Sequence, residues 1–407
     1  MEFLIPKFYK DFRCIGSNCE DTCCQNWRVY LDKKTYKKYK KYKDDKEIKK
    51  LFDKVIKRNK NNFCEADYAI IDIEKGKECV FLDENKLCSI YTKCGEDFMG
   101  NTCKVYPRIY SDMNVFIEAG LELSCPEVCR LALLNQEKME FDLTDIDIKN
   151  NLFSGFNFNL FKTKEQNIFW DLRNFSIGLI QNRNYTIDER MMILGIIIND
   201  IDSLFKSEYY DKVLKKISDY QYAIDNMEFK DVVKSLDIKT EEQLNLMKEI
   251  SKLPYKGNKS NKSYDKLFNE SLELLEYDEE NMEKMTLNYK ENKELYYKNI
   301  VDKKSYILEN YIVTIMYNTK FPYSSIFNAN LFDNFCAMVM KFAILKFNLI
   351  SRAKYFGEDI SDDKLVEIIY KISRNLEHNP KFIMNAIQEM DSKNTKNLAH
   401  MIVILNN

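Results

Sequence analysis

The sequence predicts a mainly α protein in which a small, irregular, cysteine-rich N-terminal region with a few short strands packs on a larger helical body. The 407 residues include only 10 glycines and 6 prolines. Because both residue types interrupt helices, their scarcity favours long helices over a many-stranded sheet. All of the 12 cysteines except Cys336 lie before residue 130. The chain therefore changes character near residue 135.

Helix-start signals support the helical body. Thr186-Ile-Asp-Glu189 is a capping box, in which the threonine and glutamate side chains satisfy free backbone amides. It opens the run Met191–Phe205, which is apolar on nearly all sides and is predicted to be buried. A second capping box starts at Thr240. Ser361 precedes two acids that favour a third helix start.

We expect three regions: a cysteine-rich metal- or cluster-binding region over 1–135, a helical region over 136–290, and a C-terminal helical region over 291–407. The polar stretch near 253–288 is predicted to be a linker or surface loop, since it holds Pro254, Gly257 and a Lys/Asn/Ser cluster. In the first region, Leu51, Phe52, Val55 and Ile56 form one helical stripe. We interpret the lysines around them as a solvated face rather than a binding surface.

Composition limits the partners and the compartment. A net charge of −2 provides no overall attraction to nucleic acid. The N-terminus lacks the apolar segment and cleavage site of a signal peptide. The stretch Leu331–Ile350 is apolar but contains Asp333, Lys341 and Lys346, so a buried helix is expected rather than membrane insertion. The sequence thus predicts a cytoplasmic protein, where disulfides are disfavoured. It does not indicate the oligomeric state.

The cysteines fall in groups whose spacing is typical of metal ligands. Thiolates two to five residues apart on a loop can converge on one ion, and distant groups then complete the site. Soft sulfur ligands favour zinc, cuprous copper or iron–sulfur clusters. Reduced, buried thiols are the alternative. The spacing decides neither the metal nor the number of sites. The groups are Cys14, Cys19, Cys23 and Cys24; then Cys79, Cys88, Cys94 and Cys103; then Cys125 and Cys129, with Cys64 between the first two groups.

The order of these motifs resembles the flagellin lysine N-methylase family, within a wider group of proteins with a CxxCxxCC-type zinc- or iron-chelating segment. The resemblance covers both ends of the chain, and the region 136–300 offers no matching motif. The matching elements are Pro6, Tyr9, Phe12, Cys14, CEDTCC, Trp27, Asp32, Thr35-Tyr36, CVFL from Cys79, LCSIY from Leu87, Gly95-Glu96, Thr102-Cys103, YPR from Tyr106, SCPE from Ser124, and SRNLEHN from Ser373.

The resemblance implies a protein lysine methyltransferase that acts on flagellin lysines, with S-adenosylmethionine as methyl donor. It also implies a cysteine-ligated iron–sulfur cluster, of the 4Fe–4S type, with zinc as the alternative. The cysteines Cys64, Cys94 and Cys129 lie outside the family pattern. The resemblance implies that the cluster ligands are Cys14, Cys19, Cys23, Cys24, Cys79, Cys88, Cys103 and Cys125.

The donor site is not identified by a familiar motif. No G-x-G occurs in the chain, although a nucleotide-binding turn usually contains one. Cys19 and Cys23 have the first interval of a Cys-x3-Cys-x2-Cys motif, but Asn26 occupies the third position. Two other functions therefore stay open: a zinc-stapled adaptor without enzymatic activity, and an iron–sulfur redox protein.

Methyl transfer to lysine requires a base, because only the neutral amine attacks and its ordinary pKa is about 10.4. The candidates are Glu377 and His378, with Arg374 in the same element, and the tyrosines Tyr317 and Tyr323. Adjacent helical residues point about 100° apart, so Glu377 and His378 should not face one substrate. The alternative interpretation is a structural polar cluster between packed helices.

Overall fold

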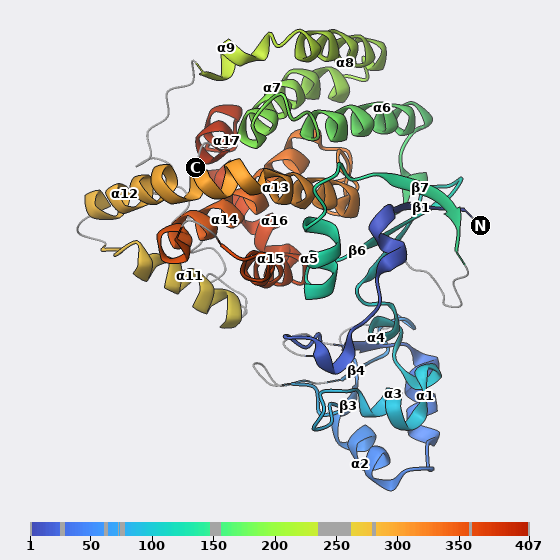
Figure 1. The fold of residues 1–407 in the computed structure, drawn as a ribbon. Helices are drawn as coiled ribbons and strands as arrows, with labels where there is room; N and C mark the ends of the chain where they lie inside the picture. Colours follow the sequence, from blue (N-terminus) through green and yellow to red (C-terminus); the bar gives the residue numbers. More distant parts are fainter. Residues whose placement is uncertain are drawn as a thin grey trace.

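The computed structural model describes residues 2–24, 29–60, 64–71, 73, 78–146, 156–234, 262–278, 282–357 and 360–405. Within these ranges the fold is mainly α, as predicted, with two small sheets in the N-terminal third. Figure 1 shows a large helical body and a smaller unit beneath it that contains α1 to α4, β3 and β4.

The larger sheet joins the N-terminus to the helical body. Its strand order is β5-β6-β1-β7, where β1 (Glu2–Pro6) pairs parallel with β6 (Ile117–Leu121) and antiparallel with β7 (Phe141–Asp145). Strand β5 (Arg108–Asp112) pairs antiparallel with β6. The buried side chains of β1, Phe3 and Ile5, belong to the core of the helical body.

The smaller unit has a core of its own. Its three-stranded sheet has the order β2-β4-β3, with β2 (Val29–Leu31), β3 (Ile56–Arg58) and β4 (Ala69–Ile71). Helix α2 (Lys46–Val55) begins at Asp45, whose carboxylate accepts from two backbone amides, and it buries Phe52 among neighbouring aromatic rings. The other helices of this unit are α1 (Lys33–Lys41), α3 (Ser89–Cys94) and α4 (Asn101–Val105).

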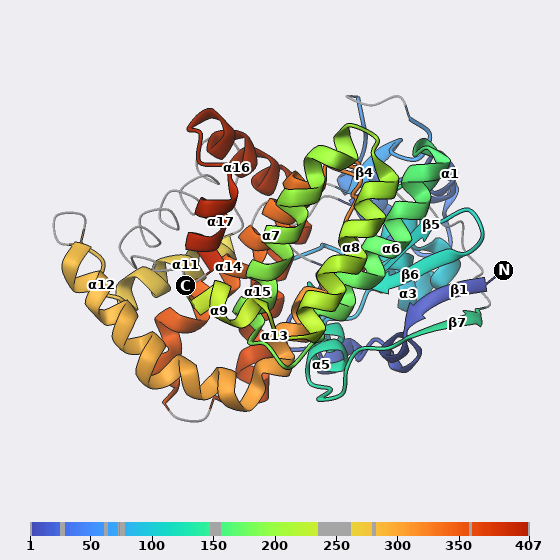
Figure 2. The ribbon, with the colours of Figure 1, turned by 90° about the horizontal axis from the view of Figure 1, so that it is seen from above.

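Helix α7 (Ile187–Lys206) begins at the predicted capping box. The Thr186 hydroxyl accepts from the Glu189 amide at 3.3 Å, and the Glu189 carboxylate accepts from the Thr186 amide at 2.7 Å. Figure 2 shows α7 beside α6 (Thr163–Ile180) and α8 (Tyr210–Asp225), and the three helices pack on one another. Helix α5 (Pro126–Leu133) lies below α13, and α9 (Phe229–Lys234) contacts α7.

Helix α14 (Leu331–Phe356) is the central element of the body. It is long and apolar enough to cross a membrane by composition, with a mean hydropathy of 1.3, but 89% of its apolar window is buried in the fold. This confirms the predicted buried helix. Around it pack α7, α11 (Lys262–Leu274), α13 (Lys298–Thr319), α15 (Asp362–Glu377), α16 (Pro380–Ser392) and α17 (Leu398–Leu405). Helix α15 begins at Ser361, whose hydroxyl accepts from the Lys364 amide, as predicted.

The polar stretch near 253–288 is not a linker where the structure describes it. It forms α11 (Lys262–Leu274) and most of α12 (Met282–Glu291), which continues through a π-helical turn (Asn292–Tyr297) into α13. Enough apolar residues, among them Phe268 and Leu275, face the core, and the polar ones cover the outside. Residues 253–261 and the capping box at Thr240 lie outside the described residues.

One hydrophobic core extends from Phe3 through α5 to Leu405, and the second core contains only residues between Val29 and Ile90. The partly buried Cys79, Cys88 and Cys103 pack against the small core, whereas Cys125 packs against the large one. The cysteine-bearing segments therefore meet where the two cores adjoin.

Candidate functional site

Backbone contacts bring the first two cysteine groups together. The Cys79 amide donates to the Cys24 carbonyl at 2.7 Å. The chain then folds back, because Leu82 pairs with Cys88 in an isolated antiparallel bridge. This turn places Cys79 and Cys88 at the same end of a short hairpin-like segment. Cys103 follows in α4, and Cys125 caps the N-terminus of α5.

The thiols are close enough to influence one another. The pKa of Cys23 is lowered to about 7 by a hydrogen bond with Cys24, against the effect of burial, and by the guanidinium of Arg374. The two sulfur atoms are 4.0 Å apart. The pKa of Cys79 is raised to about 11 and that of Cys125 to about 12, mainly by burial, and the charge of Cys23 contributes to both shifts. Cys23, Cys24, Cys79 and Cys125 thus contribute to one thiol-rich region.

The other cysteines have different surroundings. Cys64 is exposed, and the buried Cys129 thiol donates to the Leu123 carbonyl at 3.0 Å. Cys336 is buried in α14. None of the 12 cysteines, all of which lie among the described residues, forms a disulfide. Among the described residues, no three Cys, His, Asp or Glu side chains converge closely enough to hold one metal ion. The donor set of soft, facing thiols nevertheless has the chemistry that suits a sulfur-ligated group.

Helix α15 connects the thiol-rich region to the helical body. Arg374 is buried, and its guanidinium forms an ion pair with Asp21 at 2.8 Å and donates to the Ser124 carbonyl at 3.2 Å. Asp21 lies between Cys19 and Cys23, and Ser124 directly precedes Cys125. One side chain of α15 therefore contacts residues next to two cysteine groups.

Glu377 lies one helical turn after Arg374. Its two carboxylate oxygens accept from the backbone amides of Leu123 at 3.1 Å and Ser124 at 2.8 Å. Burial raises its pKa to about 7, and the neighbouring Glu122 carboxylate adds to the rise, whereas His378 opposes it. A carboxyl group in this environment changes its protonation state near neutral pH, as a general base requires.

His378 directly follows α15 and, like Glu377, lies near Glu122. Its Nε2 atom lies 3.8 Å from the Glu122 carboxylate, and its ring packs edge-on against Tyr106. The two candidate tyrosines have structural contacts: the Tyr317 hydroxyl donates to the Leu4 carbonyl at 2.5 Å, and that of Tyr323 to the Glu165 carbonyl at 2.7 Å. None of these three side chains lines the cavity described next.

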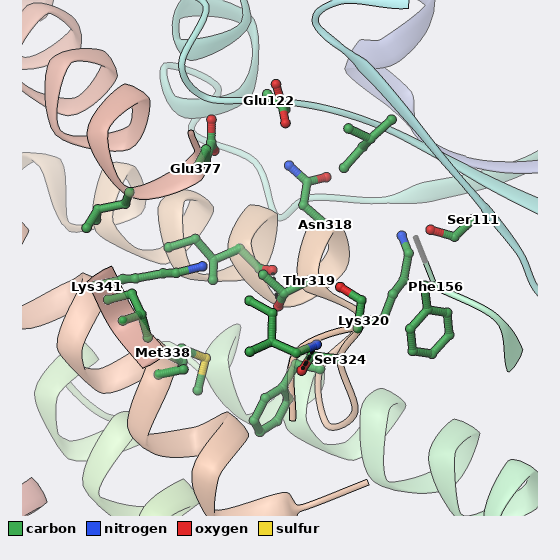
Figure 3. Close-up of a pocket in the computed structure, with 18 of the residues that line it drawn as sticks. Ser111, Glu122, Phe156, Asn318, Thr319, Lys320, Ser324, Met338, Lys341 and Glu377 are labelled. Atoms are coloured by element: carbon green, nitrogen blue, oxygen red, sulfur yellow. Dashed lines mark hydrogen bonds between the residues drawn. The ribbon is translucent and has the colours of Figure 1, made fainter. Parts of the chain in front are cut away.

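A cavity of about 440 Å³ opens beside Glu377, between the larger sheet and helices α13 to α16. Figure 3 shows Glu122 and Glu377 at one end of it, with the Lys341 side chain extending into the middle. One face of α14 forms a wall, because Asn334, Ala337, Met338 and Lys341 follow helical spacing. The volume lies in the range of small-molecule sites.

A buried ion cluster supports the far end of the cavity. Glu118, on β6, lies 2.9 Å from the Lys320 ammonium and 3.1 Å from the Arg173 guanidinium, and all three side chains are almost fully buried. Lys320 lines the cavity and adopts a left-handed backbone conformation, with a φ of 66°, at the C-terminal end of α13. The acid holds both cations in place beside the cavity.

The comparisons with known proteins identify the family. The FliB lysine N-methylase C-terminal domain matches residues 173–404, more than half of the 407 residues. The chain belongs to this family. The matched range contains Lys320, Lys341, Arg374 and Glu377, whereas the cysteine groups lie before it. The cavity and α15 are thus largely built from the FliB C-terminal domain.

Individual relatives are similar over a shorter range. The flagellar biosynthetic protein FliU of Salmonella muenchen is 33% identical over 135 residues, which are 33% of this chain and 78% of that protein. Lysine-N-methylases of Salmonella choleraesuis and Salmonella typhimurium are 31% identical over 135 residues, 33% of each protein's length. The similarity to these two enzymes therefore spans about a third of them. No solved structure matches the chain.

Sequence reasoning named Glu377, which lines the cavity, and Arg374, which does not, but it did not predict the cavity. Glu122 and Asn318 belong to segments without a motif. Lys341 interrupts an apolar helix, and a charge in such a helix is the signal that points to a buried site. Its spacing from Asn334, Ala337 and Met338 is the other signal.

Proposed function

We propose that the chain is a protein lysine N-methyltransferase that transfers methyl groups from S-adenosylmethionine to lysine side chains of flagellin, in the cytoplasm. Two observations support this proposal. The chain belongs to the FliB family, and two relatives bear the name lysine-N-methylase. The single observation that carries the chemistry is Glu377, a carboxylate whose pKa is raised to about 7 at the wall of a cavity of about 440 Å³.

The reaction needs a neutral amine next to the donor methyl group. The lysine nitrogen forms a bond to the methyl carbon while the carbon–sulfur bond breaks, and its electron pair stays on sulfur as a thioether. Before attack, the substrate ammonium must release one proton. Glu377 accepts this proton in our proposal, and Glu122 beside it attracts the positive charge of the incoming ammonium. The amides of Leu123 and Ser124 hold the Glu377 carboxylate in orientation.

Exclusion of water also favours the neutral amine. Burial disfavours the charged form of a lysine, so an acceptor side chain that enters this cavity should lose its proton more easily than in solution. Arg374 acts as a positioning residue, because it contacts Asp21 and Ser124 rather than the cavity.

We further propose that the thiol-rich region binds an iron–sulfur cluster of the 4Fe–4S type, or zinc. When bound, such a group would cross-link loops that contribute little apolar core of their own. The exposed Cys64, Cys94 and the buried Cys129 are weaker candidates. The proposed ligands are drawn from Cys14, Cys19, Cys23, Cys24, Cys79, Cys88, Cys103 and Cys125.

Incubation of the cluster-replete protein with flagellin and labelled donor tests the proposal. We expect label on flagellin lysines, and we expect a thermal scan with saturating donor to shift upward, since a ligand that binds only the native state stabilises it. Absence of both donor binding and label would favour an adaptor or a redox protein instead.

A further inference from the structure

The charges around the cavity are unevenly compensated. At one end, Glu122 and Glu377 lie close to each other (Figure 3). At the other end, Lys320 is neutralised by Glu118 at 2.9 Å. Two other cations line the cavity. The Arg108 guanidinium lies over the Phe12 ring, 5.1 Å from its centroid, whereas the Lys341 ammonium points into the cavity between the two ends.

Lys341 has no close acidic partner. Within the part of the chain that the structure describes, no side chain lies at ion-pair or hydrogen-bond distance from its ammonium. The carboxylate that influences the pKa of Lys341 is the more distant Glu377. Burial lowers its pKa. A charge that is held away from bulk water without a partner is energetically unfavourable. An anionic ligand group placed in the cavity would offset this.

The rest of the lining restricts the ligand further. Apolar side chains, among them Phe156, Phe327, Met338 and Ile383, form much of the wall. A matching ligand therefore has an anionic group for Lys341, a cationic centre for the end with two carboxylates, and a sizeable, largely uncharged part. An amino-acid zwitterion attached to a nucleoside through a sulfonium satisfies all three requirements.

We propose that Lys341 binds the α-carboxylate of the methyl donor, and that the cavity along α14 is the donor site that no sequence motif reveals. This inference rests on the proposed function only for the identity of the donor. The sulfonium then lies toward Glu122 and Glu377, on the side where the acceptor amine must enter. The Met338 and Phe327 part of the wall takes the uncharged remainder.

Calorimetric titration of the full chain with two product-like ligands tests this assignment. S-adenosylhomocysteine carries the α-carboxylate, and 5′-methylthioadenosine lacks the amino-acid part altogether. For Lys341→Met we expect S-adenosylhomocysteine to bind roughly 10- to 100-fold more weakly, the usual contribution of a charge-assisted hydrogen bond. Affinity for 5′-methylthioadenosine should stay within about twofold. Lys354→Met, in the exposed part of the same helix, is the matched control and should change neither affinity.

Two results would overturn the assignment: equal weakening of both ligands in Lys341→Met, which indicates a role in shaping the cavity, or no weakening of either. Should the variant fail to fold, the native protein decides. It must bind S-adenosylhomocysteine more tightly than the analogue from which only the carboxylate has been removed, and equal affinities contradict the proposal.

The same data separate this inference from the proposed function. If S-adenosylhomocysteine binds in a Lys341-dependent way but no lysine is methylated, the donor-site proposal is supported and the lysine-methylase proposal is contradicted. If Lys341→Met changes neither the methylation rate nor the affinity for the donor, only the donor-site proposal is contradicted.

Discussion

We expect the native protein to lose stability as the pH rises from about 4.5 to about 7, because Glu377 ionises in that range. The variant Glu377→Gln should not show this loss. The folded-state pKa of Glu377 is raised from 4.5 to about 7 by burial and by Glu122. The protonated carboxyl is therefore the form that folding favours. Its contribution is fully present below the unfolded pKa and is lost as the pH passes through the folded pKa.

The pKa difference sets the magnitude. A rise from 4.5 to about 7 corresponds to about 3 kcal/mol for a fully dehydrated group. Because Glu377 lines a cavity that water can enter, we take about 2 kcal/mol as the lower bound. For a protein of this size, that amounts to roughly 2–4 °C in melting temperature.

The assay compares melting temperatures of the native protein and Glu377→Gln at pH 5 and pH 8. The variant loses one carboxylate acceptor for the Leu123 or Ser124 amide, but this cost is the same at both pH values. Glu122, His378 and Lys341 are the same residues in both proteins.

We therefore expect the melting temperature of Glu377→Gln, relative to the native protein, to increase between pH 5 and pH 8. The same ionisation predicts that methylation by the native enzyme increases through a pKa of about 7. A difference that is constant with pH would refute the assigned environment of Glu377.

Three further outcomes follow from the structure. Cys23→Ser should release bound metal and loosen the N-terminal third, whereas Cys336→Ser should leave the metal content unchanged; equal metal content in both variants contradicts the ligand assignment. Arg374→Met removes the buried partner of the Asp21 carboxylate and should destabilise the protein by about 3 kcal/mol, with partial recovery in Arg374→Lys. An unchanged melting temperature would show that the 2.8 Å ion pair does not link the thiol-rich region to the helical body. Gly195→Ala places a Cβ atom 2.6 Å from a buried ring of α14 and should lower the free energy of unfolding in urea by about 1–3 kcal/mol. An unchanged free energy of unfolding would contradict this close packing.

Local signals in the sequence predicted local structure well. The Thr186 capping box and the Ser361 cap depend on side chains a few residues apart, and both are present. The burial of α14 followed from its composition. In each case, the interaction that decides the structure lies within one or two helical turns.

Long-range features could not be predicted in the same way. The cavity needs Glu122 from the strand-rich segment and Lys341 from α14, and no periodicity connects two such positions. The polar composition of 253–288 concealed α11, because that helix is stabilised by contacts with α14 rather than by its own sequence. Likewise, the ion pair between Asp21 and Arg374 joins the two ends of the chain.

The most direct test of the central proposal is mass spectrometry of flagellin after incubation with this protein and a donor that carries a deuterated methyl group. The account predicts mass gains of whole labelled methyl groups on lysines, and a rate about 10²- to 10⁴-fold lower with Glu377→Gln. If cluster-replete protein that binds the donor leaves every flagellin lysine unlabelled, the lysine-methylase proposal is contradicted.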